Sequence, residues 1–167
     1  IVFIFIGFLL VFIFGTKAKK ILLISVLIVI NSVLMFLIRI SQLPIELEVK
    51  TFGIVLITKL YGLKIAFIFI ILCVVISMIL SQRFNILKIV EITVDLLLAY
   101  ITNILPIGNI GQIGIIVSII NVVFSFMLAQ FVLMLPLNLT IMINLTNLIS
   151  NIIIFSTFGN IVYKLFS

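Results

Sequence analysis

Residues 21–38 read ILLISVLIVINSVLMFLI, eighteen consecutive positions without a charged side chain. As an α-helix this run is about 27 Å long, which nearly matches the roughly 30 Å hydrocarbon core of a bilayer. The apolar residues are continuous and do not alternate with polar ones, so the run fits a spanning helix better than a barrel strand. Charged residues bound it on both sides, Lys20 before it and Arg39 after it.

The same composition extends over the whole chain. Hydrophobic residues occupy 66% of its 167 positions and charged residues only 8%, a composition that no soluble fold could cover with polar surface. Because a bilayer core offers no water to open backbone groups, such a chain must form helices or a closed barrel. We therefore expect an all-α, polytopic transmembrane helical bundle, multi-pass in the cell (plasma) membrane and in contact with membrane lipid. Residues 1–167 are expected to form a single integral membrane domain.

Polar breaks divide the chain into six or seven predicted membrane segments. Residues 1–15 are predicted to be an extra or truncated N-terminal span, and we expect its true start to be missing because residue 1 is already inside an apolar run. Residues 21–163 are predicted to form a six-segment bundle. Its predicted segments are 21–38, 51–61, 65–80, 86–105, 113–135 and 141–163.

The stretch 51–80 decides between six and seven segments. As one helix it would be about 45 Å long, too long for one straight crossing. Lys59, Gly62 and Lys64 therefore predict a break, which leaves a short segment at 51–61 that is tilted or partly buried. If this segment crosses, six cations share the side of Lys17 against four on the other, whereas without it the split is five and five. The positive-inside rule slightly favours seven crossings, with the Lys17 side in the cytoplasm.

Two acids lie inside the predicted segment 86–105. Glu91 and Asp95 are four residues apart and so share one helix face. Acids within a membrane must face the bundle interior, pair with a cation or be protonated, and they are functional candidates by default. We predict that Asp95 lines a cavity or polar contact. For Glu91 a structural role is equally open, because Lys88 is three residues before it and could pair with it near the interface.

Two later segments carry polar stripes at three- or four-residue spacing. The stripe predicted to bind ligand consists of Asn144, Asn147 and Asn151, and the stripe predicted for helix packing consists of Gly114, Ser118, Asn121 and Ser125. Small and polar faces let membrane helices approach closely and form hydrogen bonds, so the simpler interpretation is that these two helices pack together. The alternative is that the amides and the acids surround a small polar ligand in an otherwise apolar bundle.

The most polar loop, RISQLPIELEVK at 39–50, supplies two more candidates. Pro44 disfavours helix there, so we expect an extended, interfacial loop. Its acids, Glu46 and Glu48, are added to the predicted ligand-binding residues.

Several functional classes are excluded by what the chain lacks. It has no histidine and one cysteine, Cys73, so a zinc protease helix, a serine–histidine pair and a thiolate metal site cannot be built. Its only aspartate rules out an aspartyl protease pair. We expect no enzyme, no metal and no cofactor. The net charge of +6 comes from cations at the ends of apolar runs, so no nucleic acid partner is expected either.

The order of the predicted segments from residue 21 onward, about four fifths of the chain, forms a recognisable pattern. A first span ends in LIRISQLPIELEVKTF at 37–52, a short second segment ends in LYG at 60–62, and a third helix follows directly. A polar break, SQRFN at 81–85, precedes three further spans. This order resembles the S component, or substrate-capture subunit, of energy-coupling factor transporters and the related small MreD-type proteins. The resemblance implies ligand binding from the outer side beneath the 39–50 loop, and energy from ABC-type ATPases through a transmembrane coupling subunit.

Two functional hypotheses follow. The first is a non-enzymatic, membrane-embedded subunit that binds a small solute, such as a vitamin-like micronutrient, for uptake energised by partner proteins. The second is a non-catalytic structural or scaffolding subunit, MreD-like or part of a larger membrane complex, whose polar stripes only pack helices. A fragment of a longer transporter is a third, weaker option.

Overall fold

The computed structural model describes residues 15–41, 49–81, 86–106 and 108–167, and within these ranges the chain is helical with no strand. The all-α prediction is thus confirmed. Its elements are α2 (Gly15–Ser41), α3 (Lys50–Tyr61), α4 (Leu63–Ser81), α5 (Ile86–Ile104), α6 (Ile110–Phe131) and α7 (Leu137–Ile154), with α7 continued by a π-helical turn η1 (Phe155–Gly159) and α8 (Asn160–Phe166). The predicted span 1–15 and the candidates Glu46 and Glu48 lie outside the described residues.

By length and composition, three helical stretches of the described chain can cross a membrane. They are Lys17–Ile38, Ile110–Phe131 and Leu137–Phe166. A shorter apolar helix covers Leu63–Ile79. These helices indicate a membrane protein, while the count of six or seven crossings stays a prediction.

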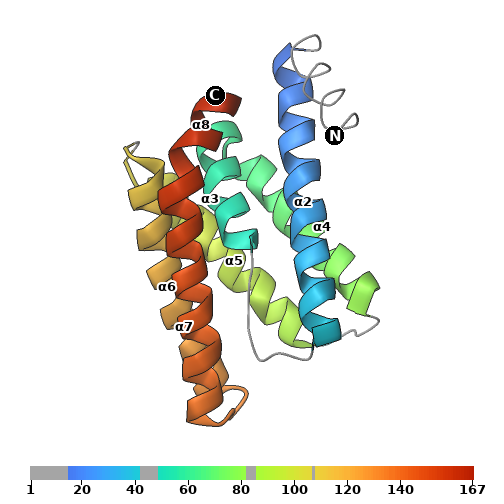
Figure 1. Ribbon diagram of the computed structural model, residues 1–167, viewed down its shortest axis with the longest axis vertical. Coiled ribbons are helices and arrows are strands. Elements are labelled where there is room, and N and C mark those ends of the chain that lie inside the picture. Colours follow the sequence, from blue (N-terminus) through green and yellow to red (C-terminus); the bar gives the residue numbers. More distant parts are fainter. Residues whose placement is uncertain (1–14, 42–48, 82–85, 107) are drawn as a thin grey trace.

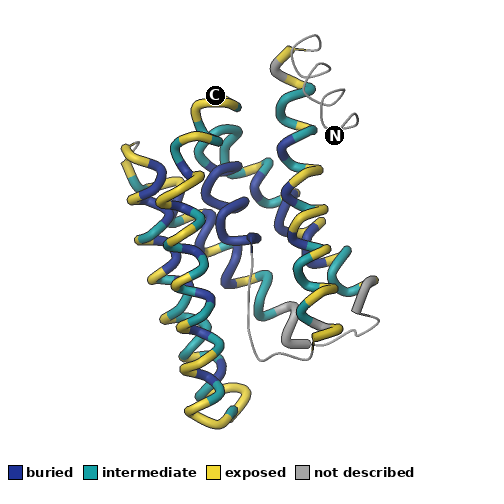
Figure 2. Tube along the Cα trace, in the orientation of Figure 1, coloured by how far each residue is buried: buried dark blue, intermediate teal, exposed yellow. Residues whose placement is uncertain are grey.

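The helices pack around α3, which occupies the centre of the bundle (Figures 1 and 2). Its twelve residues measure about 18 Å, too short to cross a hydrocarbon core alone. Every residue from Lys50 to Thr58 is buried. The predicted short, buried segment is therefore found, and the predicted break lies at Gly62, whose φ of +82° suits glycine and ends α3 one residue before α4.

The exterior of the bundle is apolar, and its interior combines an apolar core with buried polar groups. Large apolar side chains are exposed on every long helix, among them Ile21 of α2, Ile68 of α4 and Ile141 of α7. The buried polar residues instead include Lys50, Thr51, Asp95, Asn121, Thr140, Asn144, Asn147 and Asn151. A soluble monomer rarely exposes such extensive apolar surface, so this distribution fits a bundle surrounded by lipid.

The two ends of the bundle differ. Figure 1 shows the start of α2, the end of α3 and the end of α8 at one end, which we call the lysine end because it carries Lys17, Lys19, Lys20 and Lys59. The turn between α6 and α7 lies at the opposite end. Helix α3 occupies the half nearer the lysine end, so its first residue, Lys50, begins inside the bundle.

The predicted span 113–135 extends too far toward the C-terminus. Helix α6 ends at Phe131, and the amides of Leu133 and Leu135 bond back to carbonyls of its last turn. Two features close the helix: Met134 takes a positive φ of 49°, and Pro136 disfavours helix at the residue before it. Residues 132–135 are apolar, so hydrophobicity alone could not show this end.

An aromatic contact joins α3, α6 and η1. The Phe155 ring is fully buried and lies 5.1 Å from the Phe52 ring, centroid to centroid. It occupies the space over Gly114, where an added Cβ would lie 1.9 Å from a ring carbon. A residue without a side chain at 114 is therefore required for η1 to approach α6.

Candidate functional site

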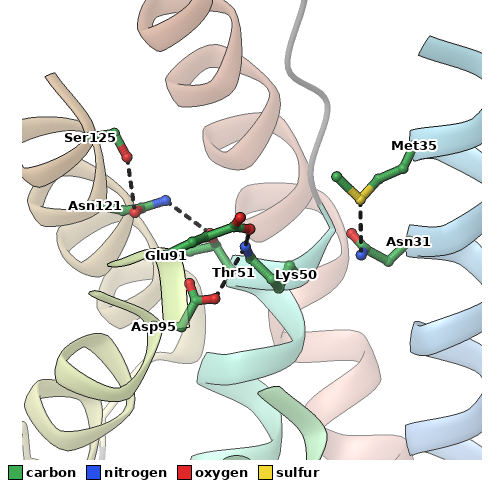
Figure 3. A network of polar contacts seen from close by, with 8 residues as sticks. All are labelled: Asn31, Met35, Lys50, Thr51, Glu91, Asp95, Asn121 and Ser125. Atoms are coloured by element: carbon green, nitrogen blue, oxygen red, sulfur yellow. Dashed lines mark hydrogen bonds and ion pairs between the residues drawn. The ribbon is translucent and has the colours of Figure 1, made fainter. Parts of the chain in front are cut away.

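A buried cation and two carboxylates meet at the centre of the bundle (Figure 3). Lys50, the first residue of α3, has a side chain only 5% exposed. Its ammonium group forms ion pairs with Glu91 Oε1 and with Asp95 Oδ2, the latter at 3.1 Å. Because α5 packs against α3 and the acids are four residues apart, both carboxylates face the same ammonium group.

The N-terminus of α3 also attracts the two carboxylates. The first backbone N–H groups of a helix have no partner within it, and they give this end a partial positive charge. No acid occurs in the first turn of α3. Asp95 and Glu91 from α5 therefore supply the negative charge that both Lys50 and the helix end require.

Amide and hydroxyl groups of α6 extend this network. Asn121 Nδ2 donates to Thr51 Oγ1 at 3.1 Å, and Ser125 Oγ donates to Asn121 Oδ1 at 3.5 Å. These bonds connect α6 to the residue that follows Lys50, as Figure 3 shows. The predicted small and polar stripe of α6 thus faces α3 as well as its chain neighbour α7.

The asparagines of α7 add further polar side chains to this region. Asn144 Nδ2 donates to the Thr140 carbonyl at 2.9 Å, and Thr140 Oγ1 accepts a bond from Gln130 of α6 at 2.8 Å. Asn151 Nδ2 donates to Asn147 Oδ1. Asn144 and Asn147 are both buried, so their amides are placed for contacts inside the bundle.

These groups surround a cavity of about 270 Å³ between α3, α5, α6 and α7. Its polar lining consists of Lys50, Glu91, Asp95, Asn121, Ser125, Thr140, Asn144 and Asn147. Apolar residues of α5, α6 and the α6–α7 turn complete the wall, among them Val94, Leu128 and Leu133. The volume is close to the lower end of the roughly 300–1,000 Å³ usual for small-molecule sites.

The structure brings most of the predicted residues together. Glu91, Asp95, Asn144 and Asn147 line the cavity, as do Asn121 and Ser125, which were predicted only for packing. Three further predicted residues do not line it. Asn151 is buried beneath Asn147, Gly114 lies under Phe155, and Ser118 donates to the Gly114 carbonyl at 2.7 Å.

Lys50 was missed as a site residue. The sequence interpretation placed it at the end of a polar loop and considered Lys88 as the cation for Glu91; the Lys88 side chain lies outside the described part. One sequence feature is relevant to Lys50: it begins a segment too short to span, so at least one end of that segment must lie inside the bundle.

The arrangement suits ligand binding better than catalysis. Ionised, the three charges sum to −1, and the amides offer both donors and acceptors around them. Within the described ranges, no group of three potential metal-binding His, Cys, Asp or Glu side chains occurs. The cavity can therefore hold a small polar molecule, and its chemistry favours one that carries hydrogen-bond donors or a positive charge.

Comparisons of the chain with protein-family models, with curated proteins and with solved structures find no match. Since a fold alone does not fix a function, the function is argued from the side chains around the cavity.

Proposed function

We propose that this chain is a multi-pass plasma-membrane subunit that binds a small polar solute for uptake. The observation that carries the proposal is the cavity in which Lys50, Glu91 and Asp95 meet the amides of Asn121 and Asn147. Burying charges and amides in an apolar bundle is unfavourable, and such groups within a membrane typically mark a ligand or ion pathway.

The position of the cavity supports binding from the outer side. Its lining includes Val132, Leu133 and Leu135 of the α6–α7 turn, at the end opposite the lysine end. By the positive-inside rule the lysine end faces the cytoplasm. A solute would then enter from outside, as in the S components that the order of elements resembles.

The proposal includes partners. The chain carries no nucleotide-binding loop, so any ATP-driven uptake requires a partner ATPase. By the same resemblance we assign this role to ABC-type ATPases acting through a transmembrane coupling subunit. A vitamin-like micronutrient, small and rich in hydrogen-bonding groups, is the solute class that fits a cavity of about 270 Å³.

Variants of the cavity test the proposal. Asp95→Ala and Asn147→Ala should lose the small molecule that co-purifies with the wild-type protein, and should lose its uptake by cells. Ser150→Ala is the matched control, because Ser150 donates to the Thr146 carbonyl of its own helix and does not line the cavity. Full uptake by both cavity variants would disprove the assignment of the site.

One observation favours the structural alternative. The bonds from Lys50 to α5 and from Thr51 to α6 also hold α3 at the centre of the bundle, and they need no ligand for that role. A scaffolding subunit predicts that the cavity variants lower thermal stability and that no small molecule accompanies the wild-type protein.

A further inference from the structure

A second hollow lies at the lysine end, and it shares no lining residue with the cavity around Lys50. It measures about 440 Å³, is open to the surroundings, and is bordered by the start of α2, the end of α3 and the end of α8. We call it the lysine hollow. Its lining consists of Lys17, Lys19, Lys20, Lys59, Leu60, Tyr61, Tyr163, Phe166 and Ser167.

Every charged side chain that lines the lysine hollow is positive. Four lysines from two helices line it, and no Asp or Glu side chain does. Three of these lysines are in the first turns of α2, where no acid occurs and where the helix dipole is unfavourable for cations. The fourth, Lys59, already donates to the Leu105 carbonyl at 2.6 Å. The lysines of α2 therefore gather positive charge at this end of the bundle, beside the C-terminal ends of α3 and α8, whose dipoles are negative there.

A buried hydroxyl points to the same conclusion. The Tyr61 hydroxyl is buried without a hydrogen-bond partner among the described residues, although buried polar atoms nearly always have one. Tyr61 lines the lysine hollow, and Lys20 Nζ lies 5.5 Å from the centre of its ring. An anion with several acceptor oxygens would satisfy this hydroxyl and the lysines together.

We propose that the lysine hollow binds a phosphate group. Phosphate carries its charge on several oxygens, so it can accept bonds from several ammonium groups and from a tyrosine at once. Leu60 and Phe166 add apolar surface beside the cations, and tyrosines with lysines are typical of the level of lipid headgroups. The phosphate can come from an anionic phospholipid or from a soluble phosphate compound.

Ordinary positive-inside bias is the competing explanation, and the chain offers a control for it. Lys64 and Lys164 are exposed and near the same end, in the first turn of α4 and in α8, but neither lines the lysine hollow. Lys64→Gln/Lys164→Gln removes the same charge as Lys19→Gln/Lys20→Gln. If the lysine hollow is a specific site, only Lys19→Gln/Lys20→Gln lowers binding. If only the overall charge matters, both pairs lower binding equally.

The experiment measures binding by native mass spectrometry on the full chain in nanodiscs. One arm uses phosphatidylglycerol as the probe in a phosphatidylcholine background. The other uses pyrophosphate with phosphatidylcholine alone. We expect Lys19→Gln/Lys20→Gln to lower the affinity for the bound probe about tenfold, and the control pair to stay within about twofold. Tyr61→Phe, which removes only the hydroxyl, should weaken binding less and serves as a test if the lysine variant fails to fold.

Each outcome decides the proposal. Selective loss in the lipid arm supports it with phospholipid as the source, and selective loss in the pyrophosphate arm supports it with a soluble compound as the source. The proposal is overturned if the wild-type protein retains neither probe, if both lysine pairs lose binding equally, or if Tyr61→Phe and Lys19→Gln/Lys20→Gln both bind as the wild type does.

Discussion

At the scale of single residues, Lys50 Nζ lies between two carboxylates from one face of α5, and the ion-pair network of the cavity depends on this geometry. The Asp95 side chain is only 4% exposed, whereas that of Glu91 is 27% exposed. Removing the cation would take from Asp95 its buried counter-ion, and breaking a buried ion pair by removing one partner is strongly unfavourable.

Lys50→Met is therefore expected to lower the free energy of unfolding by about 3 kcal/mol, near the lower end for a broken buried pair because Glu91 is partly exposed. Urea unfolding in detergent, followed by circular dichroism, measures the change. Lys64→Met, at an exposed position, should change it by less than about 0.5 kcal/mol. Equal effects of the two substitutions would contradict the role given to Lys50.

The acids and amides of this network were predictable from the sequence, but its cation was not. Glu91, Asp95 and Asn147 were predictable because acids and amides in apolar helices must find polar surroundings. Lys50 was not, because which cation reaches Asp95 depends on how α3 packs against α5, a contact between residues 45 positions apart. The spacing rule that suggested Lys88 considers only neighbours on one helix.

At the scale of elements, the short α3 was predictable from physical length: the thirty residues 51–80 are too long for one helical crossing, and Gly62 offers the break. The end of α6 was not predictable, because 132–135 is as apolar as the helix before it. The π-helical turn η1 is also beyond sequence patterns, since it depends on Phe155 packing over Gly114 and against Phe52.

Gly114→Ala tests this packing. The new methyl group would lie 1.9 Å from the Phe155 ring, so α6 and η1 must separate, and we expect a loss of about 2 kcal/mol or more in unfolding free energy. Gly108→Ala is the matched control, because the nearest atom to its Cβ is 4.0 Å away. In a Phe155→Leu background the effect of Gly114→Ala should shrink. An unchanged effect there would show that Phe155 is not the cause.

At the scale of the whole molecule, the apolar exterior fits a surrounding membrane, and the two unlike ends predict an orientation in it. Met134, in the turn between α6 and α7, is 83% exposed, and α8, which contains Lys164, lies at the other end. Composition predicted the membrane class, but orientation depended on a difference of two cations, too small for the sequence to fix.

Cysteine labelling tests the orientation. The native Cys73 is buried and is replaced by alanine as the background. A membrane-impermeant maleimide added to intact cells should then label Met134→Cys, and it should label Lys164→Cys only after the cells are opened. The reverse pattern would invert the orientation and close the proposed outer entrance to the cavity.

The most direct test of the central claim is to purify the full-length protein gently from its own host and identify by mass spectrometry the small molecules and proteins that accompany it. A binding subunit for uptake predicts one polar metabolite, absent from Asp95→Ala protein, together with paired ABC-type ATPases. Recovery of cell-wall or respiratory subunits with no metabolite would contradict the claim, and the polar residues of the cavity would then serve only to hold the helices together.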